Sequence, residues 1–147
     1  PLADACITRP GHRAADGLLG TWRVATERGK RLGTTTLTLS TGDCLIEEVF
    51  RGRGGFELRS FLFFDRFVGA WHRVQVDNRA NGLHLGGGFE GTDLQLTGSV
   101  TGPRGRTRAV RLTWTPSGAD GFVQRWEEQK PDGTWRNLAE LQWTRDS

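Results

Sequence analysis

The sequence has no apolar run near the ~18 residues that a membrane-spanning helix needs, and charged residues recur along all 147 positions. No segment of ten or more residues repeats its apolar positions with the 3.6-residue period of an amphipathic helix. No internal repeat, low-complexity tract or inter-domain linker is visible either. These absences exclude a transmembrane helix and a helical bundle, and they favour a single β-rich domain with its own core.

A segregated basic surface is also missing. Lys and Arg number 20 against 17 Asp and Glu, which gives a formal net charge of +3. The basic residues alternate with acidic ones and form neither a stripe nor a lysine-rich tract. Because nucleic-acid binding depends on clustered positive charge, we expect no nucleic-acid partner, and we expect no membrane partner.

The chain begins at Pro1 and contains no methionine, so we expect that an initiator, with or without a leader, was removed or left out. Only two cysteines are present, Cys6 and Cys44. They are either two inert thiols in a cytoplasmic protein or one disulfide that ties a polar N-terminal arm to the rest of the chain. We favour the disulfide, because the arm has little else to hold it, and with it a periplasmic or secreted location.

Period-two alternation of apolar and polar residues, broken by turn residues every eight to twelve positions, dominates the rest of the sequence. Connections this short allow only neighbouring strands to pair, which predicts an up-and-down meander. Closing the meander into a barrel removes the exposed edges of an open sheet and leaves room for one small ligand. The predicted strands are 19–27, 33–40, 43–51, 56–64, 68–77, 82–88, 93–100, 107–115, 121–128 and 138–145.

The fold class predicted is therefore all-β, an antiparallel up-and-down barrel of eight to ten strands with a short N-terminal arm. We assign residues 1–16 to the arm and residues 17–147 to a single barrel domain. The sequence does not define the oligomeric state and is compatible with a homodimer.

The stretch Gly20-Thr21-Trp22 places a glycine two residues before a tryptophan, which lets the chain turn tightly and bring the indole under one end of a closed sheet. With Thr144-Arg145 ending the last strand, the chain resembles the calycin superfamily, the lipocalins and their relatives. It resembles more closely a bacterial family of lipocalin-like proteins of unknown function, the DUF1579 type. The matching stretches are LGTWRV (19–24), CLIEEVFRG (44–52), SFLFFD (60–65), RLTWTP (111–116) and QRWE (124–127).

This resemblance implies a lipocalin-like barrel in which the tryptophan of the first strand packs against an arginine near the end of the barrel, here Trp22 and Arg145. It also implies a cysteine in the arm and another in the third strand, which strengthens the expectation of a disulfide. The chain departs from the family pattern at Arg73 and Gln75, where a glutamine and then a second tryptophan are usual. The resemblance implies no activity.

Alternation gives each strand two faces, and we predict that the faces mixing polar and aromatic residues point into the barrel. Apolar walls with a few charged or amide groups are what a small-molecule site requires. On the alternative interpretation, Glu48 forms an internal ion pair with Arg73 or Arg111 and has no ligand to meet. The predicted ligand-binding residues are Glu48, Ser60, Phe64, Trp71, Arg73, Gln75, Arg111, Gln124 and Trp126.

The first hypothesis for function is a binding protein that holds an apolar or aromatic acid in its cavity. The second is a cyclase or isomerase that uses the same cavity with Glu48 as acid or base, and the third is a barrel filled by its own side chains. The three histidines show no metal-ligand spacing, so we expect no metal and no cofactor. A single axial histidine for haem, His72 or His84, is the one alternative, and a solvent-facing histidine is favoured over it.

Overall fold

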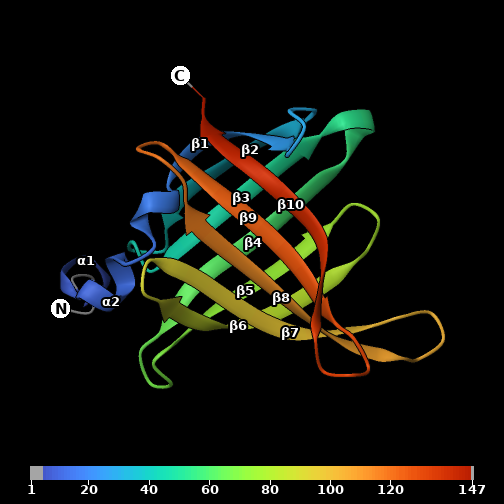
Figure 1. Cartoon of the computed structure of the whole chain (residues 1–147). Coiled ribbons are helices and arrows are strands. Elements are labelled where there is room, and N and C mark those ends of the chain that lie inside the picture. Colours follow the sequence, from blue (N-terminus) through green and yellow to red (C-terminus); the bar gives the residue numbers. More distant parts are fainter. Residues whose placement is uncertain (1–4, 147) are drawn as a thin grey trace.

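The structure, a computed structural model, describes residues 5–146 and is an antiparallel barrel closed by ten strands (Figure 1). Each strand pairs with its neighbours in sequence, and β1 pairs with β10 to complete the ring. The predicted all-β up-and-down barrel is confirmed, at the upper end of the expected strand number. The strands are β1 Gly20–Thr26, β2 Arg31–Ser40, β3 Leu45–Gly52, β4 Glu57–Asp65, β5 Ala70–Asp77, β6 Gly82–Glu90, β7 Asp93–Thr101, β8 Thr107–Pro116, β9 Gly121–Gln129 and β10 Trp135–Arg145.

Short helical segments precede the barrel and interrupt it once. The segments α1 (Ala5–Thr8), α2 (Pro10–Arg13) and η2 (Asp16–Leu18) lie before β1, and η3 (Arg53–Gly55) joins β3 to β4. None of the helices among residues 5–146 is long and apolar enough to cross a bilayer. Residues 1–4 of the predicted arm and Ser147 at the end of the predicted barrel domain lie outside the described residues.

The tenth strand shows the largest difference from the predicted strand bounds, because it begins at Trp135 and not at 138. The register between β9 and β10 shifts between Asn137 and Ala139, which marks an irregularity of the β-bulge type. A bulge adds one residue to one strand and so interrupts the alternation of its faces. The period-two pattern therefore recovers only the part of β10 that follows the bulge.

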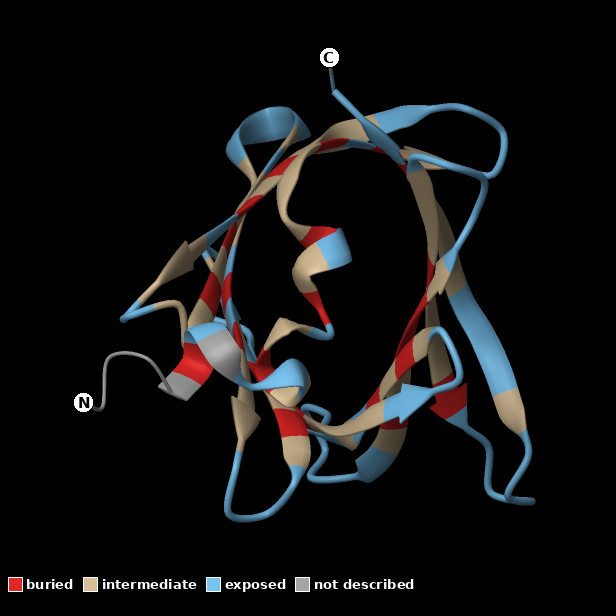
Figure 2. Cartoon of the chain, turned by 90° about the vertical axis from the view of Figure 1, so that its left-hand side faces the viewer, coloured by how far each residue is buried: buried red, intermediate tan, exposed pale blue. Residues whose placement is uncertain are grey.

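Successive strands run in opposite directions, so the connections gather at two ends of the barrel. The N-terminal helices lie at one end, which we call the arm end, together with the loops after β2, β4, β6 and β8 (Figure 1). The opposite end, the open end, carries the loops after β1, β3, β5, β7 and β9. Figure 2 looks onto the arm end and shows the helical segment that leads into β1 lying within the ring of strands.

Trp22 and Arg145 close the arm end together, as the resemblance implied. They are directly paired across β1 and β10, and the Arg145 Cζ lies 4.3 Å from the centroid of the Trp22 ring, within cation–π distance. The guanidinium also donates to the carbonyl oxygens of Leu19 at 2.9 Å and Gly17 at 3.3 Å. The indole N–H of Trp22 donates to the Leu18 carbonyl at 2.8 Å, so the arm is bonded to the barrel that it covers.

Gly20 permits this closure in two ways. Its φ of 120° is one that residues with a side chain rarely adopt, and a Cβ at this position would lie 2.7 Å from Nη1 of Arg145. A larger residue would therefore strain the backbone and displace the arginine. The glycine two residues before Trp22 is thus required by both the turn and the close approach of the guanidinium.

Large apolar side chains fill the arm half of the barrel. Trp22, Leu96 and Leu112 are completely buried, and Trp114 and Trp143 are nearly so. Trp143 lies between the two other indoles, with ring centroids 6.0 Å from Trp22 and 6.2 Å from Trp114. The arm adds Ala15 and Leu18 to this core. On the open-end side of this core the barrel has open space, and a separate hollow of about 480 Å³ lies at the arm end between the arm and the ends of β6 to β9.

The predicted disulfide is present between Cys6 in α1 and Cys44 just before β3. The two cysteines are 38 residues apart in sequence, and the bond ties the arm to the β2–β3 connection. The described part of the chain has no free cysteine.

His12 in α2 makes the stability of the arm dependent on pH. The imidazole is 7% exposed, packs edge-on against Phe64 with centroids 5.2 Å apart, and neither ring nitrogen has a hydrogen-bond partner within residues 5–146. Burial lowers the pKa of His12 below its usual 6.5, and the positive charges of Arg9, Arg13 and Arg66 lower it further.

His12 therefore binds a proton less readily in the folded protein than in the unfolded chain. The free energy of unfolding is unaffected by this difference above pH 6.5 and decreases as the pH falls below 6.5 toward the lowered pKa. We expect the free energy of unfolding to decrease more between pH 7.5 and pH 5 in the wild type than in His12→Phe, where Phe keeps the aromatic packing. Urea unfolding at several pH values measures this. Parallel pH profiles for the two proteins would contradict the assignment.

Candidate functional site

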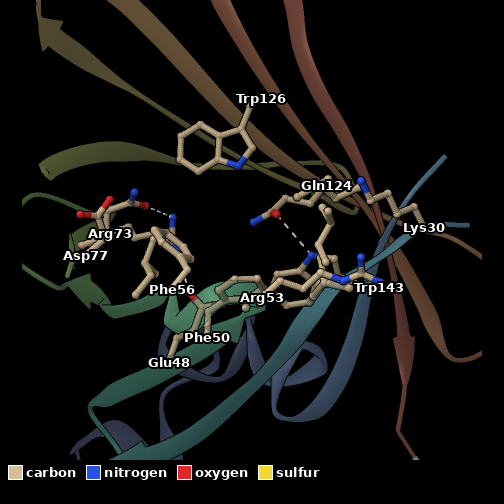
Figure 3. Close-up of a pocket in the computed structure, with 16 residues that line it drawn as sticks. Lys30, Glu48, Phe50, Arg53, Phe56, Arg73, Asp77, Gln124, Trp126 and Trp143 are labelled. Atoms are coloured by element: carbon tan, nitrogen blue, oxygen red, sulfur yellow. Dashed lines mark hydrogen bonds and ion pairs between the residues drawn. The ribbon is translucent and has the colours of Figure 1, made fainter. Parts of the chain in front are cut away.

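A cavity of about 550 Å³ enters the barrel from the open end (Figure 3). This volume is within the range of ~300–1,000 Å³ that is usual for small-molecule sites. Its walls come from β1, β2, β3, β4, β5, β9 and β10, and the filled arm half of the barrel forms its floor. The lining residues are Val24, Lys30, Leu32, Glu48, Phe50, Gly52, Arg53, Phe56, Leu58, Arg73, Gln75, Asp77, Gln124, Trp126, Leu141 and Trp143.

A buried ion pair lies on one wall of the cavity. The Arg73 Nη2 donates to Glu48 Oε1 at 2.6 Å, and the two residues are only 3% and 4% exposed. Ser60 donates to the same carboxylate oxygen at 2.8 Å, and Thr35 donates to the other at 2.8 Å. The carboxylate thus has a cation and two hydroxyl donors, which offset the cost of burying its charge.

Arg73 is itself held on several sides. Its Nη1 donates to Gln75 Oε1, two residues further along the same face of β5. Its Cζ lies 5.5 Å from the Trp114 ring centroid and 5.9 Å from that of Trp126, at cation–π distance from both indoles. The guanidinium is therefore fixed between Glu48 and two aromatic rings, and its charge is balanced within the barrel.

Aromatic residues form opposite walls of the cavity. Trp126 projects from β9, which is separated from β3 and β4 by several strands in either direction around the barrel. Phe50 at the end of β3 and Phe56 just before β4 pack against each other with centroids 5.9 Å apart. Figure 3 shows Trp126 across the cavity from these two rings. The space between them suits a flat apolar group.

Charged residues surround the mouth of the cavity. Lys30 lies in the β1–β2 turn and Arg53 in η3, and neither has a carboxylate within 4 Å in residues 5–146. Asp77 at the end of β5 accepts hydrogen bonds from the backbone N–H of Asn81 and of Arg79. These bonds, the one from Asn81 foremost, lower the pKa of Asp77 and keep its carboxylate ionised as part of the β5–β6 turn. The mouth therefore carries the ionised carboxylate of Asp77 and two cations, Lys30 and Arg53, that form no ion pair within residues 5–146 and leave a net positive charge for an anionic group.

Five of the nine predicted ligand-binding residues line this cavity: Glu48, Arg73, Gln75, Gln124 and Trp126. Ser60 lies behind them, bonded to Glu48. The mixed polar and aromatic faces of β3, β5 and β9 do point inward, as predicted.

Phe64 and Trp71 also point inward but lie at the other end of the barrel. They pair across β4 and β5 near the arm, with ring centroids 5.7 Å apart, and Phe64 packs against His12. Neither lines the open-end cavity. Their distance from it follows from strand direction, because β4 ends and β5 begins at the arm end.

Arg111 does not enter the barrel, which corrects the predicted face of β8. It forms a two-pronged ion pair with Glu127, with both N···O distances 3.0 Å, and its Cζ lies 4.2 Å above the ring of Trp135. The inward face of β8 is instead formed by the buried Val110, Leu112 and Trp114. The large apolar side chains take the interior, and the arginine pairs across the strands on the outer surface.

The three histidines lie away from the cavity. His72 and His84 stack on neighbouring strands with Nδ1 and Nε2 3.1 Å apart. His72 lies on the face of β5 opposite to Arg73, and His84 on the face of β6 opposite to the core residue Leu85. His12 belongs to the arm. Within residues 5–146 no group of three or more His, Cys, Asp or Glu side chains is placed to hold a metal ion.

A second hollow, of about 630 Å³, lies where the ends of β8, β9 and β10 meet at the open end. Arg106, Arg108, Lys130 and Arg136 line it, and Glu128 accepts from both Arg108 and Arg136. It has no aromatic wall, and none of the predicted ligand-binding residues reaches it. The cavity of about 550 Å³ inside the barrel, which we call the open-end cavity, is the better candidate for an organic ligand.

Comparison with protein-family models and with curated proteins finds no match for this chain. The closed ten-strand antiparallel barrel is consistent with a calycin-like fold, which is the level at which the resemblance seen in the sequence is supported.

Proposed function

We propose that the protein binds a small apolar or aromatic acid in the open-end cavity, with the acidic group at the mouth and the flat body between the aromatic walls. The observation that supports this most strongly is the cavity of about 550 Å³ between Trp126 and the pair Phe50 and Phe56. A barrel filled by its own side chains would leave no such space.

The position of the acidic group follows from where positive charge is unbalanced. Deep in the cavity, the charge of Arg73 is matched by Glu48 at 2.6 Å. At the mouth, Lys30 and Arg53 have no carboxylate partner in the described chain, so a carboxylate there gains two cations without displacing an existing pair.

The arrangement does not favour the alternative of a cyclase or isomerase that uses Glu48. Both of its carboxylate oxygens accept hydrogen bonds, from Thr35 on one side and from Ser60 and Arg73 on the other. One lone pair of Oε2 is left, so a general base would have to work through this single position on a carboxylate already held by three donors. Glu48 acts instead as an anchor for Arg73.

The disulfide supports a periplasmic or secreted location, because such bonds persist in oxidising compartments. Its position away from the cavity indicates a structural role in holding the arm.

Titration with naphthoate tests the proposal, followed by calorimetry and tryptophan fluorescence. We expect the double variant Lys30→Gln/Arg53→Gln to bind naphthoate about tenfold more weakly, because two partly solvated cations are lost. The uncharged naphthamide should bind wild type and variant equally.

Arg51→Gln is the matched control. Arg51 is exposed, is two residues from Arg53 and does not line the cavity, so its loss changes the net charge by the same single unit as the loss of Arg53. The single variant Arg53→Gln should weaken naphthoate binding and Arg51→Gln should not; equal weakening by these two single variants would show that only the overall charge matters. Absence of any naphthoate binding to the wild type would contradict the proposed function.

A further inference from the structure

The inner wall of the cavity presents hydrogen-bond donors whose orientation is fixed by their neighbours. The side-chain oxygen of Gln124 accepts from the indole N–H of Trp143 at 3.3 Å, and the oxygen of Gln75 accepts from Nη1 of Arg73. Tryptophan and arginine can only donate, so in both amides the oxygen must face the donor. The NH₂ group of each is left to point elsewhere.

Trp126 adds a third donor to the same wall. Its indole nitrogen is drawn on the side of the ring that faces the cavity in Figure 3. In the described chain, the Trp126 Nε1, the Gln124 Nε2 and the Gln75 Nε2 make no hydrogen bond, although all three residues line the cavity. Gln124 is 5% exposed, and its amide nitrogen, like the other two donors, is not among the enclosed polar atoms of the described chain, so all three are open to a molecule in the cavity.

Free acceptors are scarce on this wall. The oxygens of Gln75 and Gln124 each already accept one bond, and the two oxygens of Glu48 accept three bonds from within the barrel. A ligand oxygen that accepts from these donors replaces the water that they would otherwise bond, with a net gain on the scale of one hydrogen bond. A ligand donor would have to share an oxygen that already accepts a bond from within the barrel.

The acceptor is better uncharged than charged. Glu48 and Arg73 already balance each other, so a carboxylate placed beside them would be a buried anion without a cation of its own. A ketone oxygen accepts two hydrogen bonds and carries no net charge.

We propose that the ligand carries a ketone oxygen at its inner end, opposite the acidic group, and that Gln124, Trp126 and Gln75 select aromatic keto acids. This inference rests on the proposed function, because it takes the acidic group to lie at the mouth. The inner wall then distinguishes ligands by an oxygen that can only accept, while the aromatic walls and the mouth bind any flat acid of suitable size.

Three naphthoates that carry an acetyl, an ethyl or a hydroxyethyl group at the ring carbon farthest from the carboxylate test this selection. They share charge and nearly the same size, and they differ at one carbon, which is C=O in the acetyl, CH₂ in the ethyl and CH(OH) in the hydroxyethyl compound. We expect calorimetry on the full chain to give about 3- to 10-fold tighter binding for the acetyl compound than for the ethyl compound, the scale of one net hydrogen bond. The hydroxyethyl compound should bind more weakly than the acetyl compound.

Two variants assign the selection to the inner wall. Gln124→Met removes the amide donor, and Trp126→Phe removes the indole donor while keeping an aromatic wall. In each variant the affinity for the acetyl compound should exceed that for the ethyl compound by less than about 2-fold. Gln142→Met and Trp135→Phe are the matched controls, because neither residue lines the cavity, and both should keep the wild-type preference. Circular dichroism of each variant establishes that it is folded.

Equal binding of the acetyl and ethyl compounds to the wild type would overturn the keto-acid inference and leave the proposed function standing. A preference that survives both inner-wall variants would also overturn it. Failure of all three naphthoates to bind would overturn the inference and the proposed function together.

Discussion

We expect Arg73→Met to lower the free energy of unfolding by about 3–5 kcal/mol, the largest effect of any single substitution in the cavity wall. The side chains of Arg73 and Glu48 are 4% and 5% exposed and their charged atoms are 2.6 Å apart. Removing the guanidinium leaves a buried carboxylate with two hydroxyl donors and no cation. Urea unfolding at neutral pH, followed by circular dichroism, measures the loss.

Two further variants separate the buried charge from other effects. The double variant Glu48→Leu/Arg73→Met should recover more than half of the loss, because it removes both charges from the interior. Arg111→Met breaks a more exposed ion pair, with side chains 23% and 15% exposed, and should cost less than about 1 kcal/mol. If Arg73→Met costs no more than Arg111→Met, the internal pair does not carry the stability assigned to it.

The second large effect is expected from the double variant Cys6→Ala/Cys44→Ala. A disulfide that closes a loop between residues 38 apart restricts the unfolded chain, and its removal should cost about 4 kcal/mol on the loop-entropy estimate. The fluorescence of Trp22, which lies under the arm, should change at lower urea than in the wild type. Reducing agent should shift the unfolding of the wild type to that of the double variant.

Thiol labelling provides the independent control for the disulfide. In unfolded and unreduced wild-type protein, neither Cys6 nor Cys44 should react with a thiol reagent. Full labelling of both would show that the bond does not form in solution and would remove the support for an oxidising compartment.

The alternation of faces and the turn residues predicted the fold well, because each strand has one side facing the core and each connection is short. They predicted the first nine strands to within two residues at each end. The closure between Trp22 and Arg145 was predicted by the family resemblance. The start of β10 was predicted wrongly, since the bulge near Asn137 breaks the alternation on which the prediction depends.

The cavity wall was predicted less completely because alternation gives two faces and does not say which one points inward. On β5 and β9 the face with Arg73 or Trp126 is inward, whereas on β8 the face with Arg111 is outward. The register between β8 and β9 would have shown which face of β8 points inward. Arg111 pairs directly with Glu127, and alternation places Glu127 on the face of β9 opposite to Trp126. The sequence alone does not supply that register.

The cations at the mouth were missed for a different reason. Lys30 lies in a turn and Arg53 in the short helix η3, where no period relates a residue to the barrel interior. Phe50 shares a face with Glu48, and in the predicted strand 56–64 Phe56 shares a face with Ser60, so alternation alone could have included both.

The most direct test of the central claim is a nitrogen–proton correlation NMR spectrum that resolves the six tryptophan indole N–H signals, recorded during titration with naphthoate. We expect the signals of Trp126 and Trp143, which line the cavity, to shift in a saturable way, while that of Trp135 on the outer surface stays in place. Saturable shifts confined to Trp135, or no shift of Trp126 at naphthoate concentrations that saturate the calorimetric signal, would contradict binding in the open-end cavity.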